Sequence, residues 1–278
     1  MLKVGWFSTA RGDSSRQLLS EAINAIQCGQ LNASIEFVFC SRELGEAEKT
    51  DTFIKLVKEY KIPLVCLSVK KFAAVHQQEV AVKDAALPAW RLEYDRQVMS
   101  LLSGYNVDIC LLAGYMLIVG PEICHEYNML NLHPALPGGP KGTWQEVIWQ
   151  LINDKATHSG VMMHLVTPDL DRGPVITYCT YPIQGPDFDS LWQEIGQRPI
   201  NRIKTEEGEE NPLFKAIRRA GFSREMPLII YTLKAFSEGK IRISADKKLL
   251  DSAGNTIQGY DLTDEIEAAI SSTRPLSS

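Results

Sequence analysis

The sequence lacks the features that mark a membrane span, a secretory leader or a repeat protein. Its longest apolar run, from Ile109 to Val119, contains a glycine and a tyrosine and is shorter than the roughly 20 residues a membrane-spanning helix needs. The N-terminal segment has no basic stretch followed by a long apolar run, so we expect no signal peptide. The sequence shows no internal repeat and no low-complexity tract. These absences favour a globular cytoplasmic protein.

Closely spaced cysteines are also missing. No two of the six cysteines form a C-x-x-C pair, and four lie inside apolar runs typical of strands: Cys40, Cys66, Cys110 and Cys179. Free cysteine behaves as a small buried hydrophobe, and disulfides are rare in the cytoplasm. We therefore predict reduced core thiols rather than disulfides, and no metal site.

The sequence has fewer basic than acidic residues. The chain has 29 Lys and Arg against 34 Asp and Glu, which gives a formal net charge of −5. A general nucleic-acid or membrane-surface binder needs a basic face, so we expect neither partner, although a local basic patch stays open. The length of 278 residues allows one large domain, or one domain with an appendage. A homodimer stays open as well.

Strand-like and helix-like segments alternate along the first half of the chain. The strand-like runs are apolar throughout, which is typical of a parallel sheet that helices cover on both faces. This predicts an α/β, Rossmann-like fold, with Ser14 or Ser15 as the N-cap of the first helix. The expected strands are residues 3–9, 34–41, 63–69 and 107–115, and the expected helices are residues 14–29, 51–62 and 91–106.

The second half is less regular. It contains further expected strands at residues 128–135, 158–168, 173–183 and 240–244, and helices at residues 143–154 and 226–239. Residues 196–224 are rich in charge and suggest an inserted or mobile surface segment, and the last eight residues suggest a disordered tail. We predict a catalytic domain at residues 1–195, a charged insertion at 196–225, and a C-terminal helix, strand and tail at 226–278 that belong to the same domain.

Asn131 and His133 stand at alternate positions of an apolar run that ends at Pro134. Residues i and i+2 of a strand face the same side, so both polar side chains point one way and Leu130 and Leu132 the other. An amide and an imidazole placed together can donate hydrogen bonds to an oxygen that gains negative charge, and the imidazole can move a proton. The alternative is structural: His133 caps the strand end and Asn131 satisfies a turn.

A second polar turn follows the strand at residues 158–168. Asp169 and Asp171 lie in a short segment closed by Gly173 and Pro174. A carboxylate close to a histidine holds one tautomer of the ring and raises its pKa. The alternative is that both aspartates only make local Asx turns.

These segments resemble the folate-dependent formyltransferase family. The resemblance rests on "MLNLHPALPG" at residues 129–138, followed by "HSGVMMHLVTPDLDRGPVI". It covers most of residues 1–185 and 222–245. It implies a Rossmann-like fold and an enzyme that passes a formyl group from the co-substrate 10-formyltetrahydrofolate to an amine through a tetrahedral intermediate. The branch it matches best formylates glycinamide ribonucleotide in purine synthesis.

The resemblance also implies site residues. The catalytic triad of the family matches Asn131, His133 and Asp171. Asn131 and a protonated His133 would stabilise the oxyanion, while Asp171 would support the charged ring and help relay the proton of the amine. The pterin ring of the folate would contact two segments, through backbone groups and apolar walls: Met116, Leu117, Ile118, Val119, Asp169 and Leu170. His164 matches a histidine near the active site of relatives and is a secondary candidate.

The acceptor side of the expected site departs from the family. Related purine enzymes bind a phosphate at the first turn, through backbone N–H groups at a helix N-terminus. The matching residues here are Arg11, Gly12, Asp13, Ser14 and Ser15. Asp13 adds a negative charge to an expected anion site, and the plain alternative is a turn and helix cap. Leu117 also departs, because related enzymes commonly carry Arg there.

Other functions stay open for this reason. The acceptor amine could belong to an amino sugar nucleotide or to an aminoacyl-tRNA, although the negative charge weakens the tRNA alternative. Water could replace the amine, which would make the protein a 10-formyltetrahydrofolate hydrolase. A folate-binding sensor without catalysis is the alternative from another class, but it would not need Asn131, His133 and Asp171 together.

Overall fold

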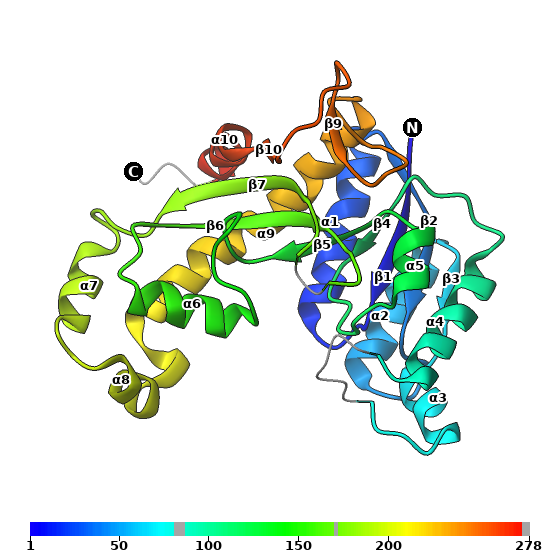
Figure 1. The fold of residues 1–278 in the computed structure, drawn as a ribbon, viewed down its shortest axis with the longest axis horizontal. Helices are drawn as coiled ribbons and strands as arrows, with labels where there is room; N and C mark the ends of the chain where they lie inside the picture. The colour runs from blue at the N-terminus through cyan, green and yellow to red at the C-terminus, as the bar shows by residue number, and fades with distance from the viewer. Residues whose placement is uncertain (81–86, 170–171, 274–278) are drawn as a thin grey trace. The chain divides into compact units, whose positions relative to one another are not determined.

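The computed structural model describes residues 1–80, 87–169 and 172–273 and divides into two compact units (Figure 1). The first unit comprises residues 1–131, 164–174 and 233–256. The second comprises residues 132–163, 175–232 and 257–278. Strands β5 (Met129–His133) and β6 (His158–Leu165) and the helix α9 (Pro212–Ser237) each contribute residues to both units.

The first unit is an α/β layer structure. Its strands have the order β5-β4-β1-β2-β3, and all four neighbouring pairs are parallel. The end of β6 continues the sheet beyond β5, where the Val166 amide donates to the carbonyl oxygen of Met129 over 2.8 Å. The other elements are β1 (Leu2–Ser8), α1 (Asp13–Gln27), β2 (Ala33–Cys40), α2 (Glu48–Glu59), β3 (Leu64–Cys66), α3 (Val69–Val75), α4 (Ala89–Leu102), β4 (Ile109–Leu112), α5 (Pro121–Glu126), β8 (Ile241–Ile243) and β9 (Leu249–Asp251).

Apolar strands and amphipathic helices produce this unit as the sequence predicts. The parallel strands carry buried aromatic side chains, and Phe7, Phe37 and Phe39 pack in one core cluster. Gly5 allows the close packing within it, because a Cβ there would lie 2.6 Å from the ring of Phe37. The predicted mostly parallel α/β fold is therefore confirmed.

The second unit has its own core and a shorter set of strands. Its strand order is β10-β7-β6, with β10 parallel to β7. The predicted helix at 143–154 is confirmed as α6, which Thr143 and Glu146 start with a reciprocal capping box. The remaining elements are α6 (Trp144–Asn153), β7 (Val175–Pro182), α7 (Asp189–Ile195), α8 (Ile200–Glu206), a short 3-10 turn (Gly208–Glu210), β10 (Tyr260–Asp261) and α10 (Thr263–Thr273).

The first helix begins earlier than predicted. α1 starts at Asp13, and its N-cap is Gly12, which has extended backbone and no side-chain cap hydrogen bond. The prediction of Ser14 or Ser15 as N-cap was therefore wrong: both serines are inside the first turn. The sequence suggested a serine cap from composition alone, but the cap is defined by the residue whose backbone is still extended.

The charged segment at 196–224 folds into helices, against the prediction of a mobile surface segment. Ile203, Phe214 and Ile217 are buried in the core of the second unit. α9 starts at Pro212 rather than near Met226, because the side chain of Asn211 accepts from the Phe214 amide and caps the helix. The predicted tail is also shorter, since α10 extends to Thr273, and residues 274–278 lie outside the described part.

Candidate active site

The turns after β1 and β4 meet at the carboxyl end of the first unit's sheet. The Thr9 amide donates to the carbonyl oxygen of Gly114 over 3.0 Å. The hydroxyl oxygen of Thr9 accepts from the Met116 amide over 2.8 Å. Ligands of open α/β sheets bind beyond the carboxyl ends of the strands. The joined turns therefore hold Met116 at the edge where a ligand is expected.

Asn131 lies in the middle of β5 and contacts His164. The amide Nδ2 of Asn131 lies 3.3 Å from Nε2 of His164, and Nδ1 of His164 lies 3.2 Å from the carbonyl oxygen of Leu165. A carbonyl only accepts, so Nδ1 of His164 donates to Leu165, and Nε2 of the same ring lies against the Asn131 amide. His164 is thus a positioning residue for Asn131.

His133, two positions further along β5, is held by the loop that follows it. Its ring is buried, and Nε2 lies 3.0 Å from the carbonyl oxygen of Pro140. Because the carbonyl is an acceptor, Nε2 carries a proton, and protonation of Nδ1 makes the ring a cation with two N–H donors. The Pro-Gly-Gly-Pro sequence after His133 therefore supplies the contact that fixes the ring.

The segment from Met116 to Val119 shows a graded exposure. Met116 has 63% of its surface exposed, Leu117 and Ile118 are half-buried, and Val119 is buried in the core cluster of the first unit. The side chains of Met116 and Ile118, two of the predicted apolar walls, are accessible, while Leu117 packs partly against the core cluster. Val119 instead anchors the segment, so its side chain belongs to the core and only its backbone is suited to a ligand.

A buried ion pair on α4, which we did not predict from the sequence, holds this segment. The guanidinium Nη2 of Arg91 donates to the carbonyl oxygen of Ile118 over 2.7 Å and lies 3.2 Å from the Asp95 carboxylate. The other oxygen of Asp95 accepts from the Gly120 amide over 2.7 Å. Both side chains are almost fully buried. Burial raises the pKa of Asp95, and the charge of Arg91 opposes this effect.

A sequence signal for this pair did exist. Arg91 and Asp95 are four residues apart, which places them on one face of a helix. Tyr94, between them, is fully buried, and the guanidinium lies 4.9 Å from the centre of its ring. Within the described residues, the Nη1 atom of Arg91 is buried and has no hydrogen-bond partner. A charged pair inside an otherwise apolar helix face indicates a buried bridge rather than a solvated one.

The turn after β6 contains the remaining predicted residues. The Thr167 hydroxyl donates to the carbonyl oxygen of Asp169 over 3.1 Å, and the Arg172 amide donates to the same oxygen over 3.2 Å. These bonds confirm a tight turn, and Asp169 is exposed in it. The predicted folate contact Leu170 and the predicted catalytic Asp171 lie outside the described residues.

Gly173 closes this turn against the strand. A Cβ at Gly173 would lie 1.6 Å from the carbonyl oxygen of Leu165, which is backbone and cannot rotate away. We expect Gly173→Ala to displace the turn and to lower the free energy of unfolding by about 1–3 kcal/mol, the usual cost of overpacking. Urea unfolding measures this. Gly104→Ala is the control, since nothing lies within 4 Å there, and an equal loss in both variants would contradict the steric argument.

The turn before α1 lies at a helix N-terminus, which favours an anion, but Asp13 of the same turn already places a carboxylate at this position. Ser15 is buried, and Arg11, Asp13 and Ser14 are exposed at the start of α1. The Lys49 ammonium lies 2.6 Å from the Asp13 carboxylate, and this hydrogen bond holds the pKa of Asp13 below its ordinary value. Lys49, which the sequence reasoning missed, therefore offsets the negative charge that Asp13 brings to the turn.

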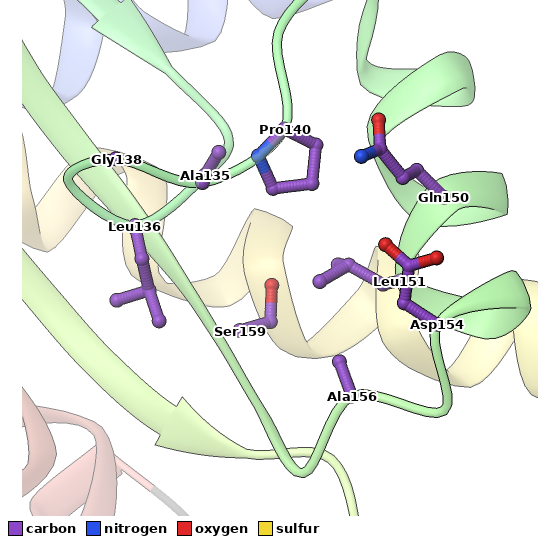
Figure 2. A pocket seen from close by; sticks show the side chains of 10 residues that line it. Ala135, Leu136, Gly138, Pro140, Gln150, Leu151, Asp154, Ala156 and Ser159 are labelled. Atoms are coloured by element: carbon purple, nitrogen blue, oxygen red, sulfur yellow. The ribbon is translucent and has the colours of Figure 1, made fainter.

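A cavity of about 350 Å³ lies within the second unit beside the loop after β5 (Figure 2). Gln150 of α6, the C-cap residue Asp154 and Ser159 supply its polar groups. The other residues that line it are Ala135, Leu136, Gly138, Gly139, Pro140, Leu151 and Ala156. His133 does not line the cavity, but its Nε2 contacts the carbonyl oxygen of Pro140, which does.

The described residues contain no group of three or more His, Cys, Asp or Glu side chains arranged to hold a metal ion. None of their helices is both long and apolar enough to span a bilayer.

The mostly parallel sheet with its helices defines an α/β protein, in which a ligand is expected beyond the carboxyl ends of the strands. Residues 12–189 match the family model described as formyl transferase, which is more than half of the chain. The chain therefore belongs to the formyl transferase family of enzymes, which use 10-formyltetrahydrofolate as co-substrate. This confirms the family resemblance seen in the sequence.

Individual relatives point in the same direction. The chain is 28% identical over 193 residues to a phosphoribosylglycinamide formyltransferase of Dictyostelium discoideum, a match covering 65% of this chain and 85% of that protein. A phosphoribosylglycinamide formyltransferase structure from Coxiella burnetii has a TM-score of 0.61 at 20% identity and covers 94% and 98% of the two chains. A formyltetrahydrofolate deformylase structure from Burkholderia mallei has a TM-score of 0.59 at 16% identity and covers 90% and 69%. Both structures establish the fold.

Proposed function

We propose that this enzyme transfers the formyl group of 10-formyltetrahydrofolate to the primary amine of glycinamide ribonucleotide. The observation that carries the proposal is the contact of Asn131 with His164, which positions an amide group in the middle of β5 beside His133 in the sequence. The named relatives that formylate phosphoribosylglycinamide support this acceptor. A cytoplasmic location agrees with the reduced cysteines and with this step of metabolism.

Asn131 and His133 perform the electrostatic part of the reaction. The amine nitrogen attacks the formyl carbon, and the carbonyl electrons move to its oxygen, which becomes negative. Hydrogen bonds from the Asn131 amide and from the His133 imidazolium stabilise that oxygen. The proton lost by the amine passes to the folate nitrogen that leaves, with Asp171 and a water as the relay. The tetrahedral intermediate then collapses to formylated amine and tetrahydrofolate.

Folate binding is assigned to the segment held by Arg91. The carbonyl and amide groups of residues 117–119 would bind the edge of the pterin ring, and Met116 and Ile118 would contact its face. Asp169 and Leu170 would contact it from the turn after β6. Arg11, Gly12, Asp13, Ser14 and Ser15 would bind the phosphate of the acceptor through the N-terminus of α1.

We also propose a domain assignment. The family model ends at residue 189, close to the end of the proposed catalytic domain at residue 195. Residues 196–225 are then an addition to the family fold, and residues 226–278 complete the domain. Ion pairs such as Arg202 with Glu206 join residues within the addition, whereas Arg224 pairs with Glu267 of α10 outside it.

The identity of the formyl acceptor distinguishes the candidate functions. Purified enzyme is mixed with 10-formyltetrahydrofolate and one amine at a time, and the absorbance of the product folate is followed. We expect turnover with glycinamide ribonucleotide and little with an amino sugar nucleotide or an aminoacyl-tRNA. Formate release without any amine would instead assign the hydrolase function, which the likeness to a deformylase structure keeps as the second candidate. Tight folate binding without any turnover would contradict both.

A further inference from the structure

Two cysteines face each other across neighbouring strands of the first unit. Cys40 is the last residue of β2 and Cys66 the last of β3, and the two are direct partners in the parallel register. Register partners point to the same face of a sheet, and neighbouring strands lie about 4.8 Å apart. Disulfides need Cα atoms roughly 4.4–6.8 Å apart. The two thiols therefore lie within bonding reach without a change of fold.

The two thiols differ in exposure and in acidity. Cys40 is fully buried, while Cys66 is half-buried on β3, the outermost strand of the sheet. The hydrogen bond from the Cys40 thiol lowers the pKa of Cys66, although burial opposes it. The same contact, together with burial, raises the pKa of Cys40. An accessible thiol beside a buried partner is the usual arrangement of an attacking and a resolving cysteine.

We propose that Cys40 and Cys66 are a redox modification site that closes to a reversible disulfide in the presence of a peroxide. The Cys66 thiolate attacks one oxygen of hydrogen peroxide, which gives a sulfenic acid and, after protonation of the leaving hydroxide, water. The Cys40 sulfur then attacks the Cys66 sulfur, loses its proton and displaces a second water. Two thiols and one peroxide become one disulfide and two waters. A dithiol reductant reverses the step.

Contacts within the first unit connect this pair to the Met116 segment. Ser41 follows Cys40 directly, and its hydroxyl donates to the hydroxyl oxygen of Thr9 over 3.1 Å. That Thr9 oxygen accepts from the Met116 amide. The Leu67 amide, next to Cys66, donates to the Cys40 carbonyl over 3.1 Å. A covalent bond between Cys40 and Cys66 shifts Ser41 and so weakens the support of Met116. This consequence, unlike the disulfide itself, rests on the proposed folate site.

Peptide mapping tests the modification directly. Trypsin releases Cys66 in the peptide 62–70 and Cys40 in the peptide 17–42, which also contains the exposed Cys28. The Cys28→Ser protein is therefore treated with hydrogen peroxide, alkylated, digested and analysed by mass spectrometry. We expect the two peptides to appear linked, two hydrogens lighter than their sum, and to separate after dithiothreitol. Sulfinic or sulfonic acid at Cys66 without linkage would overturn the proposal, as would linkage of Cys66 to any other cysteine.

The functional consequence is tested on the same samples. Binding of 10-formyltetrahydrofolate to the oxidised Cys28→Ser protein should be several-fold weaker than to the reduced one and recover with dithiothreitol. The Cys28→Ser/Cys66→Ser protein should lose nothing on oxidation, and Cys28→Ser/Cys66→Ala serves if the serine variant does not fold. A disulfide with unchanged folate binding would overturn only the coupling to Met116. A protein that binds no folate when reduced would count against the proposed function, while the mapping result stands.

Discussion

Replacing His133 by alanine should lower formyl transfer about 10²–10³-fold while folate binding stays nearly unchanged. The ring supplies hydrogen-bond donors to an oxygen that is charged only in the tetrahedral intermediate, so its removal raises the barrier and leaves ground-state binding alone. Single-turnover rates measure the first effect, and equilibrium binding of 10-formyltetrahydrofolate measures the second. Asp171→Asn should reduce transfer in the same way if it relays the proton.

The control for His133→Ala is His158→Ala, which removes an exposed ring at the start of β6. It should keep wild-type turnover. The urea midpoint of each variant shows whether the fold is intact, since His133 is buried and its Nε2 bonds to the Pro140 carbonyl. Near-wild-type transfer by a folded His133→Ala protein would remove His133 from the mechanism. A parallel loss of transfer and of folate affinity would make it a folate-binding residue instead.

Arg91→Met should lower the free energy of unfolding by about 3–5 kcal/mol, because it leaves the buried Asp95 carboxylate without its partner. It should also weaken folate binding, since Arg91 holds the Ile118 carbonyl and Asp95 holds the Gly120 amide on either side of Val119. Urea unfolding and folate titration measure the two effects. The double variant Arg91→Met/Asp95→Leu should recover part of the stability, because no buried charge is then left unpaired.

Arg96→Met is the matched control on the same helix. Arg96 binds Glu122 on α5 at the surface, where both side chains are about half exposed. A surface pair contributes little, so this variant should keep the wild-type urea midpoint. If Arg91→Met is no more destabilised than Arg96→Met, the buried bridge does not support residues 118–120. If the double variant keeps the full folate affinity, residues 118–120 hold their position without the Arg91–Asp95 ion pair.

The charged residues 196–224 show where composition misleads. Ion pairs such as Arg198 with Glu207 and Arg202 with Glu206 lie at the surface, while the isoleucines and phenylalanine between them fill the core of the second unit. The sequence carried a clear signal in Asn211-Pro212, an N-cap followed by proline at the first helical position, which marks the start of α9. Charge density alone therefore predicted disorder, and capping residues would have predicted the helix.

For the site too, the sequence predicted some features and could not predict others. Strand period alone placed Asn131 and His133 on one face of β5, and the strand was confirmed at Met129–His133. The prediction that these residues and Asp171 perform catalysis stays a proposal. The sequence could not show that His164 orients the Asn131 amide, because that contact joins residues on two strands whose pairing depends on the fold. It also could not show that the Pro140 carbonyl holds His133.

The sequence by itself determined the apolar parallel strands, the family motif and the donor pair on β5, because each depends on residues that are neighbours in the chain. Only the tertiary structure decided the burial of Arg91 and Asp95, the contact of His164 with Asn131, and the pairing of Cys40 with Cys66. These features join residues that are distant in sequence or whose environment comes from other elements. A charge or a thiol acquires its chemistry from what surrounds it, and the packing of the strands and helices sets those surroundings.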